Sequence, residues 1–383
     1  MSQLTNLIFW TDIGTPYRTD MFNYMAKCTP SLKVWYQAAS LNTRSWDLNA
    51  FKNEYPYLVS NSIHLFYRRA FFFLSPKLII KSMLLPKYSI LILALGWADP
   101  NVLIVCFLKR LGLIKAQLAF WSEANYLTNG ARNDNLLKKY VRTWVYSSPI
   151  SFQISSGYMT RLTFSHWCIP VKKYVNLFNT IQETIFKPSI YPNWAIPQDG
   201  RNRLLIVARL IEDLKGIINF MHSLGNDRIS KVFIDIVGDG PDTDKIIYFI
   251  NSNNLGEHVR LHGQLNPSDL RKLYLSTTIF VLPSFSDPCP LSVVEALWAG
   301  LPLLLSSRCG NHYEALEEGH NGYLFDPSYP SSITKAFDNL VNSHEKMYSF
   351  SKRSRSIYDT TYSLKRVVDQ FLKDLPGNCP LPQ

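Results

Sequence analysis

Two carboxylates with seven residues between them, Asp287 and Glu295, stand in the segment PSFSDPCPLSVVEALWAGLP. We expect a buried strand to end at Pro283-Ser284 and a helix to run from Leu291 to Ala299. Asp287 then falls in a loop, and Glu295 lies about two turns into the helix. The backbone N–H groups at a helix start have no intrahelical partner and attract phosphate. The segment therefore offers an anion-binding helix end with a carboxylate on each side of it.

Glu295 has two open interpretations. It lies among apolar residues of its helix, so it needs a polar partner if it is buried, and the two hydroxyls of a ribose would provide one. The alternative is a solvent-facing glutamate on an amphipathic helix, which the spacing alone favours.

Two cations lie at the end of another expected strand, RLLIVARL. Arg209 ends that strand, and Lys215 stands with Gly216 just before the helical run IINFMHSLG. Such a pair could hold a diphosphate through charge-assisted hydrogen bonds, together with the N–H groups of the helix start. The alternative is that both side chains are simply solvated, which is the usual state of surface arginine and lysine.

A glycine turn, Gly238-Asp239-Gly240, follows the expected strand KVFIDIVG. Its glycines permit positive φ or a close approach of a ligand, although a tight turn alone would explain them. Asp242-Thr243-Asp244, just beyond, has the DxD form that can chelate a metal–diphosphate. Because it stands where a helix should begin, and acidic residues there offset the helix dipole, we interpret it as a helix cap.

Short apolar runs that alternate with helical segments provide the scaffold for these loops. The expected strands are LIFWTD, SLKVWYQA, YSILILALGW and KAQLAFWSEA in the first half and RLLIVARL, KVFIDIVGDG, VRLHGQL, TIFVLPS and LPLLLSS in the second. This alternation predicts parallel sheets in two doubly wound α/β domains, as 383 residues also suggest. A proline-rich linker at 187–203 separates them, and we place the domains at 1–185 and 186–359. A C-terminal helix at about 360–383 is a candidate for packing back on the first domain. Ligands of such sheets bind outside the carboxyl ends of the strands.

The composition excludes several classes of protein. No run of about 20 apolar residues without charge appears, so no bilayer span is expected. The N-terminus lacks a basic region before an apolar core, and the six cysteines are scattered without a CxxC pair. Secretion, a zinc site and a disulfide framework are therefore not expected. We expect a cytoplasmic protein, with the inner face of the cytoplasmic membrane as a further option. The formal charge of +11 favours anionic partners without choosing among them, and a merely basic surface is equally open.

Several of these motifs, in this order, resemble glycosyltransferase family 4, a group of retaining, nucleotide-sugar-dependent enzymes that includes bacterial polysaccharide and lipopolysaccharide types. The resemblance covers roughly residues 176–327. Its main blocks are Pro283-Ser284, Asp287, Glu295, Ala299-Gly300 and Pro302, followed by Cys309-Gly310-Asn311, Glu314 and Asn321-Gly322. Upstream blocks are VARL with Lys215-Gly216, IVGDGP, and Asn179 with Phe186-Lys187-Pro188. In the first half only Thr15-Pro16-Tyr17-Arg18 is similar to a first loop found in part of the family.

The resemblance implies the GT-B fold, in which two Rossmann-like domains face each other across a cleft. It implies transfer of a sugar from a nucleoside-diphosphate sugar to a hydroxyl of a glycan, by front-face attack with retention of configuration. Cationic side chains would stabilise the departing diphosphate, so we expect no divalent metal and no other cofactor. The residues carried over are Arg209, Lys215 and Asp287 as catalytic residues, Gly238, Asp239, Gly240, Pro290, Leu291, Ser292 and Glu295 as donor-binding residues, and Gly14, Pro16 and Tyr17 in the first loop.

The sequence departs from the family pattern at three places. Asp287 stands where glutamate is usual, which shortens the reach by one methylene. The gap between Arg209 and Lys215 is slightly longer than is common. The histidine that many members place in the N-terminal domain is absent, and we take Glu123, in Trp121-Ser122-Glu123, as its substitute.

The acceptor is not determined by the resemblance. Residues 68–87 mix bulky apolar side chains with five cations, Arg68, Arg69, Lys77, Lys81 and Lys87, as an interfacial helix on an anionic membrane would. A lipid-linked oligosaccharide of cell-surface polysaccharide synthesis would suit such a helix. The alternative, which the sequence slightly favours, is a helix with its apolar face in the domain core.

Two competing functions stay open. One is a soluble glycosyltransferase that acts on a small molecule or a free oligosaccharide. The other is a non-catalytic nucleotide or nucleic-acid binder, although no nucleic-acid module appears and the basic residues are spread along the chain. We therefore expect no nucleic-acid partner. The nucleotide, the sugar, the linkage and the oligomeric state are not determined by the sequence.

Overall fold

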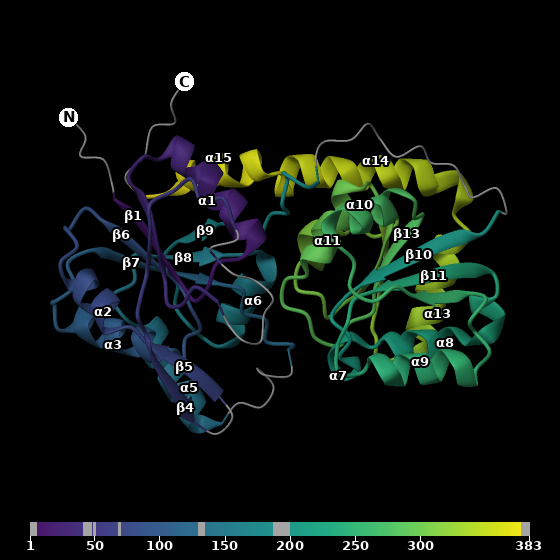
Figure 1. Ribbon diagram of the computed structural model, residues 1–383, viewed down its shortest axis with the longest axis horizontal. Coiled ribbons are helices and arrows are strands. Elements are labelled where there is room, and N and C mark those ends of the chain that lie inside the picture. The colour runs from purple at the N-terminus through teal and green to yellow at the C-terminus, as the bar shows by residue number, and fades with distance from the viewer. Residues whose placement is uncertain are drawn as a thin grey trace. The chain divides into compact units, whose positions relative to one another are not determined.

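The structure, a computed structural model, describes residues 6–40, 48, 51–67, 70–128, 135–186 and 200–376. These residues form two compact units (Figure 1). The N-terminal unit comprises the described residues of 1–126, 133–182 and 364–383, and the C-terminal unit comprises those of 127–132 and 183–363. The long segment of the C-terminal unit therefore begins at Glu183, and the chain returns to the N-terminal unit at Leu364. Most of the expected linker, residues 187–199, lies outside the described residues.

The N-terminal unit contains a parallel sheet of seven strands in the order β3-β2-β1-β6-β7-β8-β9. The order reverses between β1 and β6, which are neighbours in the sheet. The strands are β1 (Leu7–Thr11), β2 (Leu32–Tyr36), β3 (Tyr57–Val59), β6 (Ile90–Ala94), β7 (Gln117–Ser122), β8 (Phe152–Ser155) and β9 (Tyr174–Asn176).

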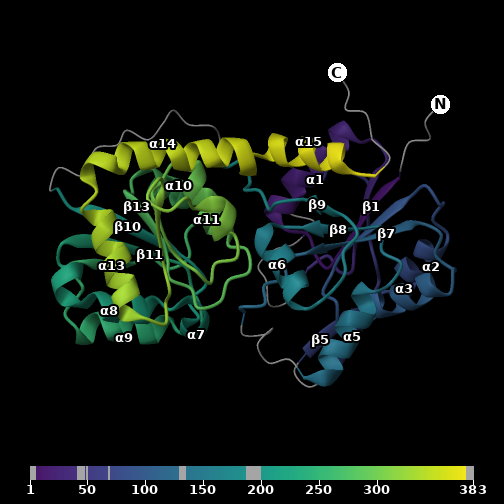
Figure 2. The same ribbon diagram turned by 180° about the vertical axis from the view of Figure 1, so that it is seen from behind.

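Helices cover both faces of this sheet because successive residues of a strand point to opposite sides. Leu7 and Phe9 of β1 belong to a core shared with helices α1 (Pro16–Cys28) and α15 (Leu364–Asp374). Ile8 and Trp10 belong to the opposite core, which is shared with α2 (Pro76–Met83), α3 (Pro100–Arg110), α5 (Leu136–Tyr146) and α6 (Tyr158–His166). Figure 2 shows α2, α3 and α5 from behind, away from α1 and α15. The C-terminal helix α15 thus completes the core of the N-terminal unit.

The single helix considered for residues 68–87 is wrong. Ala70–Leu74 is strand β5, which pairs antiparallel with β4 (Ile63–Tyr67), and α2 begins only at Pro76. The run of aromatic residues favours an extended strand, and a proline fits the first turn of a helix. Arg68 and Arg69 lie outside the described residues.

The C-terminal unit contains a parallel sheet of six strands in the order β12-β11-β10-β13-β14-β15. The strands are β10 (Asn202–Val207), β11 (Val232–Val237), β12 (Val259–Leu261), β13 (Ile279–Leu282), β14 (Leu303–Ser306) and β15 (Gly322–Phe325). The helices are α7 (Glu212–Lys215), α8 (Ile217–Ile229), α9 (Thr243–Ser252), α10 (Pro267–Leu275), α11 (Leu291–Trp298), α12 (His312–Ala315), α13 (Pro330–Val341) and α14 (Met347–Ile357), with a π-helical turn at Tyr358–Tyr362 and a 3₁₀ turn at His344–Lys346. The expected doubly wound parallel architecture is confirmed.

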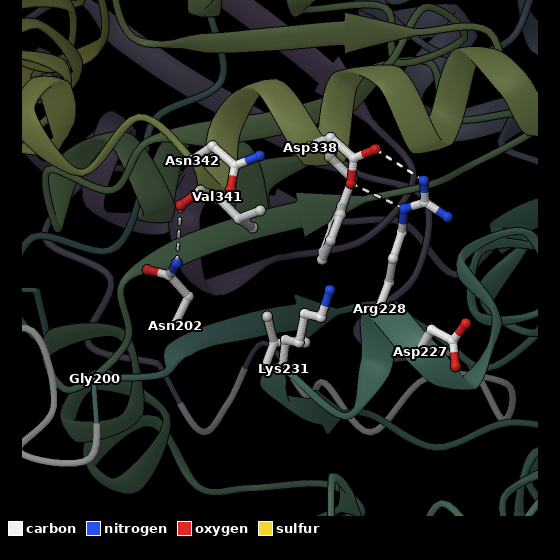
Figure 3. A pocket seen from close by; sticks show the side chains of 10 residues that line it. Gly200, Asn202, Asp227, Arg228, Lys231, Asp338, Val341 and Asn342 are labelled. Atoms are coloured by element: carbon white, nitrogen blue, oxygen red, sulfur yellow. Dashed lines mark hydrogen bonds and ion pairs between the residues drawn. The ribbon is translucent and has the colours of Figure 1, made fainter.

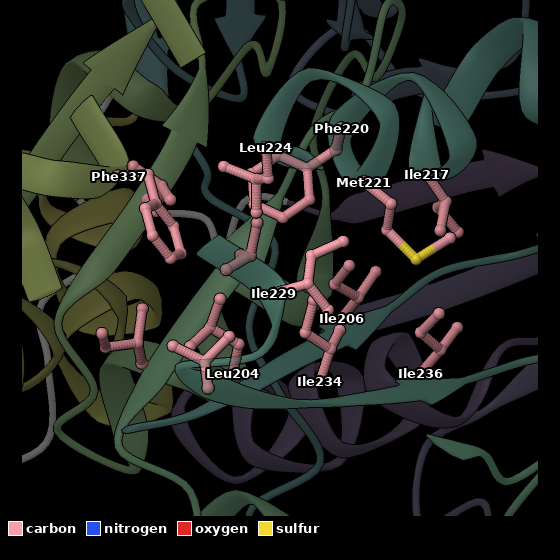
Figure 4. Packing of buried hydrophobic residues seen from close by; sticks show 14 of the residues in the cluster. Leu204, Ile206, Ile217, Phe220, Met221, Leu224, Ile229, Ile234, Ile236 and Phe337 are labelled. Carbon is pink, nitrogen blue, oxygen red and sulfur yellow. The ribbon is translucent and has the colours of Figure 1, made fainter. Parts of the chain in front are cut away.

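The core of the C-terminal unit lies between this sheet and helices α8 and α13. Figure 4 shows alternate residues of β10 and β11, among them Leu204 and Ile234, packed against one face of α8 and against Phe337 of α13. Phe220 and Leu224 form that face of α8, at the spacing of one helical turn. The core therefore fixes the strands whose carboxyl ends carry the predicted site residues.

The order of the C-terminal sheet reverses between β10 and β13. These strands are neighbours, although β11 and β12 come between them in the sequence. The chains that leave their carboxyl ends turn in opposite directions, and ligands of open α/β sheets bind at such a point. Lys215 follows β10, and Asp287 follows β13. Among the described residues no helix is both long and apolar enough to cross a membrane.

Candidate functional site

Lys215 and Asp287 form an ion pair at the reversal point of the C-terminal sheet. Lys215 Nζ contacts Asp287 Oδ2, and the two side chains are only 15% and 13% exposed. The short helix α7 positions the lysine, because Ser286 N donates to Leu214 O at 3.1 Å and so fixes the loop after β13 beside it. Two of the predicted catalytic residues are thus brought together.

Gly216 allows this close approach of the two loops. It ends α7 in the left-handed region, at φ 61°, and a Cβ there would lie 2.8 Å from Pro283 O. A side chain would therefore push the loop after β13 away from α7. The glycine of the Lys-Gly block is needed for the geometry of the lysine rather than for a turn alone.

The loop of Asp287 is also held by the glycine-rich block that follows β14. Gly310 N donates to Asp287 O at 2.8 Å, and Asn311 Nδ2 donates to Pro290 O at 3.0 Å. Asn311 is buried, and Pro290 is the N-cap residue of α11. Gly310 and Asn311, from the glycine-rich block, therefore fix the backbone of the Asp287 loop and of the start of α11.

The N-cap residue of α11, Pro290, makes no side-chain hydrogen bond to the first turn of the helix. Leu291 and Ser292, the first two residues of α11, are half-buried. The N–H groups there are among those that a helix leaves without an internal partner, and the helix dipole makes this end positive. An anion can be bound at this position, close in the chain to Asp287.

Glu295 is not the solvent-facing glutamate that spacing favoured. The residue is half-buried, and Tyr274 Oη donates to Glu295 Oε2 at 2.7 Å. Burial raises the pKa of Glu295 to about 7, and the hydrogen bond from Tyr274 opposes that rise. Glu295 therefore titrates near neutral pH, and no described residue is recorded as a partner of its other oxygen, Oε1.

Tyr274 was missed by the sequence analysis because no local motif marks it. Its ring is fully buried, and the rings of Phe186 and Phe280 lie 6.2 and 6.1 Å from it, centroid to centroid. Phe186 also contacts Trp298 of α11, with 5.0 Å between centroids. The phenylalanine of the expected interdomain segment thus packs behind Glu295, whereas Lys187 and Pro188 lie outside the described residues.

Arg209 stands apart from the Lys215 ion pair. Its side chain is exposed, and none of the residues that the structure describes is recorded in an ion pair or hydrogen bond with its guanidinium. The solvated state considered for Arg209 is therefore the one found here. For Lys215 that alternative is wrong.

The glycine turn after β11 is shaped by the chain that follows β10. Gly238 has φ 139°, and a Cβ there would lie 1.8 Å from Ala208 O, while a Cβ at Gly240 would lie 2.2 Å from Leu210 O. Asp239 contributes to the same contact, because its carbonyl accepts from Leu210 N at 3.0 Å. These contacts alone account for both glycines.

The interpretation of Asp242 as the cap of the helix that follows it is wrong in one respect. Asp242 is the N-cap residue of α9, but its side chain does not cap that helix. Its Oδ2 accepts from the backbone N of Glu212, at the start of α7, at 2.8 Å, and its Oδ1 pairs with Lys245. Within the described ranges no group of three or more His, Cys, Asp or Glu residues could hold a metal ion.

Glu123 is anchored in the N-terminal unit at the carboxyl end of β7. Its Oε1 accepts from Arg18 Nη2 at 3.2 Å and from Asn179 Nδ2 at 2.9 Å. The guanidinium of Arg18 also lies over the ring of Trp121, 4.6 Å from its centroid, and donates to Thr11 Oγ1 at 3.1 Å. The partners of Glu123 are 105 and 56 positions away, so no local pattern could reveal them.

The residues of the first loop start helix α1. Pro16 is its first residue, and Tyr17 follows, half-buried, with its pKa raised by burial. A Cβ at Gly14 would lie 2.5 Å from Leu48 Cδ1. The loop thus places Arg18 one position after Tyr17, on the first turn of the helix.

Comparison with known proteins identifies the family. Residues 193–357 match the family described as Glycosyl transferases group 1. They belong to that family. Spore coat protein SA of Bacillus subtilis is 33% identical over 118 residues, which are 30% of this chain and 31% of that protein. The chain thus spans about a third of the length of that curated relative.

Solved structures extend the similarity beyond residues 193–357 to both units of the chain. The structure of Anabaena HepE in complex with UDP and glucose has a TM-score of 0.71 at 15% identity and covers 97% of this chain and 100% of its own. The apo lipopolysaccharide outer core galactosyltransferase WaaB also has a TM-score of 0.71, at 13% identity, and covers 96% of this chain and 98% of its own. The fold is therefore that of the GT-B glycosyltransferases.

A well-formed cavity of the group 1 domain lies away from these residues. Its volume is about 530 Å³. Figure 3 shows the residues that line it, among them the ion pair of Arg228 and Asp338. Asn202 and Val232, which begin β10 and β11, line it. It lies at the amino ends of the strands, whereas Lys215, Asp287 and the start of α11 follow the carboxyl ends. The candidate site is the second location.

Proposed function

We propose that this protein is a retaining glycosyltransferase of family 4 that binds a nucleoside-diphosphate sugar at the carboxyl edge of its C-terminal sheet. The observation that carries the proposal is the mostly buried ion pair of Lys215 and Asp287, which lies where the strand order of that sheet reverses. The uncapped start of α11 and the carboxyl of Glu295 follow in the same loop and helix. Together they offer a cation, the N–H donors of a helix start and an acceptor, as a diphosphate and a ribose require.

Lys215 is assigned to the departing diphosphate. A lysine that is mostly removed from water exerts a stronger field on a developing negative charge than a solvated one does. Asp287 keeps the ammonium in place through the ion pair, and its carboxylate is also the proposed contact to a sugar hydroxyl. Arg209, exposed and without a recorded partner, is available to a second phosphate oxygen.

Transfer with retention requires no covalent nucleophile in this proposal. The acceptor hydroxyl attacks the anomeric carbon on the face from which the diphosphate leaves. The leaving diphosphate accepts the hydroxyl proton as the C–O bond to the diphosphate breaks and the new glycosidic bond forms. The protein supplies positioning and charge stabilisation, which come from Lys215, Arg209 and the N–H groups of α11. We propose that no divalent metal takes part.

Glu123 is proposed to replace the histidine of other family members as a contact to the sugar. Arg18 and Asn179 both bind Oε1, so Oε2 stays available for a hydroxyl. The Glu123 side chain is 33% exposed, which leaves it accessible.

The proposed acceptor is a lipid-linked glycan in the synthesis of a cell-surface polysaccharide, at the inner face of the cytoplasmic membrane. The likeness to a lipopolysaccharide galactosyltransferase supports this assignment, and the likeness to a UDP- and glucose-bound structure supports a UDP-sugar donor.

A thermal-shift screen with UDP, GDP, ADP and their sugars tests donor binding. A ligand at 100 times its dissociation constant stabilises the folded state by about 2.7 kcal/mol. The cognate donor should then release nucleoside diphosphate slowly in the absence of acceptor. NMR of the product with an acceptor glycan reports the anomeric configuration. Absence of any shift and of any donor hydrolysis would refute the proposal, and inversion would refute the mechanism alone.

A further inference from the structure

The outer surface of helices α2 and α3 in the N-terminal unit is apolar and cationic. Lys77, Ile80 and Lys81 of α2, with Leu84 directly after its last residue, lie at the i, i+3, i+4 and i+7 positions of one stripe. All four are exposed. Leu84 is 77% exposed and Ile80 is 58% exposed. The opposite side of α2 is buried. This stripe therefore presents bulky apolar side chains that no described residue of the N-terminal unit covers.

Helix α3 continues the same surface. It packs beside α2 in the same core, so the outer sides of both helices point away from one face of the sheet. Phe107 and Leu111, one turn apart, are 53% and 56% exposed, and Leu113 in the following loop is 46% exposed. We call this the α2–α3 surface.

Acidic residues are almost absent from this part of the chain. From Ala70 to Ser122 there are six lysines and arginines but only one acid, Asp99. That acid is used internally, because it caps α3 through Asn101 N and accepts from Gln37. The carboxylate of Asp99 is thus hydrogen-bonded within the N-terminal unit.

Four of the six cations are exposed and are recorded in no ion pair with any described residue, namely Lys77, Lys81, Lys87 and Lys115. The other two, Lys109 and Arg110, donate to backbone carbonyls of their own unit. Lys77 and Lys81, which lie on α2 itself, give the α2–α3 surface a positive charge, and no described residue forms an ion pair with either of them.

The opposite face of the same sheet provides a contrast. Helices α1 and α15 cover it, and within their described residues neither exposes a large apolar side chain. On α15, cations alternate with Asp369 and Asp374. The apolar and cationic character is therefore confined to one side of the unit and is not a general property of a basic protein.

We infer that the α2–α3 surface docks on an anionic lipid bilayer. Apolar side chains beside lysines on one helix face are the pattern of interfacial membrane helices, where the chains enter the headgroup region and the ammonium groups meet anionic lipids. The centre of a protein–protein interface is instead depleted in lysine. The inference rests on the proposed function in one respect, namely that a lipid-linked acceptor is presented at a bilayer.

Co-sedimentation of the full chain with vesicles tests this docking. Vesicles of phosphatidylcholine alone are compared with vesicles that also contain phosphatidylglycerol. The expected result is binding to the anionic vesicles that weakens with salt. Lys77→Gln with Lys81→Gln should weaken it about thirtyfold, since each lysine near the surface contributes about a factor of five. Ile80→Ser with Leu84→Ser should weaken it at every salt concentration.

A matched control changes two lysines on the opposite face. Lys365→Gln with Lys373→Gln on α15 removes the same charge from exposed positions and should leave vesicle binding within about twofold of wild type, because these positions lie far from the bilayer. Thermal unfolding of every variant verifies that it folds. Equal loss of binding in both lysine pairs would overturn the inference, since only net charge would then matter.

Two further outcomes would also overturn it. One is binding to soluble heparin that is as tight as binding to the anionic vesicles and that Ile80→Ser with Leu84→Ser does not change. This result would indicate a site for polyanions in general. Self-association through these residues in light scattering without lipid would indicate a second copy. Donor binding in the thermal-shift assay separates this inference from the proposed function. Intact donor binding without vesicle binding refutes only the docking, and vesicle binding without donor binding refutes only the proposed function.

Discussion

Lys215 and Asp287 lie 72 positions apart in the sequence, yet their side chains form an ion pair at the reversal point of the C-terminal sheet. Neither residue is marked by local sequence as the partner of the other. The contact depends on β10 and β13 being neighbours and on Gly216, which lets the two loops approach. It makes the lysine a fixed and largely desolvated cation, and five predictions follow from this and the neighbouring contacts.

Lys215→Ala is expected to lower kcat by about 100- to 1000-fold, equivalent to about 2.7–4 kcal/mol, because a preorganised donor to the leaving diphosphate is lost. Steady-state kinetics with the cognate donor measure the change. Lys272→Ala is the matched control, because Lys272 also forms an ion pair but is 72% exposed on α10. Near wild-type turnover of Lys215→Ala would exclude the assigned role.

Asp287→Asn is expected to lower kcat/KM by about ten- to a hundredfold. Loss of a hydrogen bond to a charged group costs about 1.5–3 kcal/mol, and the amide no longer holds Lys215. Asp287→Glu restores the charge with one more methylene and should retain more activity while it changes the ranking of donor sugars. Competition between two donor sugars measures that ranking. An unchanged ranking would show that Asp287 does not contact the sugar.

Donor affinity is expected to rise with pH through about 7. The pKa of Glu295 is raised by burial to about 7, and the ionised carboxyl accepts hydrogen bonds from the two hydroxyls of a ribose more strongly than the protonated form. Tyr274 donates to this carboxyl and thereby lowers the pKa of Glu295, so Tyr274→Phe should shift the midpoint upward by about 1–2 pH units.

Calorimetry between pH 5.5 and about 9 follows the pH dependence of donor binding on both sides of this midpoint, above the ordinary carboxyl pKa of about 4. Tyr248→Phe on α9 is the control, since Tyr248 is 75% exposed. If donor affinity has the same pH midpoint in Tyr274→Phe and in wild type, the midpoint does not report the ionisation of Glu295. A merely structural role of Tyr274 would lower stability without moving the midpoint.

Gly238→Ala is expected to destabilise the protein by about 3 kcal/mol or more, because it combines an unfavourable φ with a Cβ placed against Ala208 O. Gly256→Ala is the control, since a Cβ at Gly256 meets nothing within 4 Å. Urea unfolding measures both free energies of unfolding. Equal values would contradict the close approach of the turn to the chain after β10.

Activity is expected to persist in EDTA, because cationic side chains and helix N–H groups supply the charge stabilisation that a metal would otherwise give. Product formation is measured after dialysis against EDTA and again after addition of Mg²⁺ or Mn²⁺. Loss of activity that either ion restores would contradict this expectation. It would favour Asp242 and Asp244 as ligands of a metal–diphosphate.

Much of the architecture could be predicted because it depends on local patterns. Apolar runs such as that of β10 are long enough for a buried strand, and their alternation with helices leaves few arrangements other than parallel sheets. The order of the motifs also located the loop of Asp287 and the start of α11. The secondary structure of residues 70–83 was harder to predict, because an apolar run of that length suits a strand or a helix equally. Pairing with β4 decided it.

The sequence by itself determined which residue types follow which strands, since a strand, its loop and its helix are contiguous in the chain. Only the tertiary structure decided which of those loops meet. Lys215 contacts Asp287, and Tyr274 donates a hydrogen bond to Glu295. Arg18 and Asn179 donate hydrogen bonds to Glu123. All of these contacts join distant segments of the chain. The burial that raises the pKa of Glu295 likewise comes from side chains that the fold collects around it. Strand order and packing set these contacts, and neither is encoded in any short stretch of the chain.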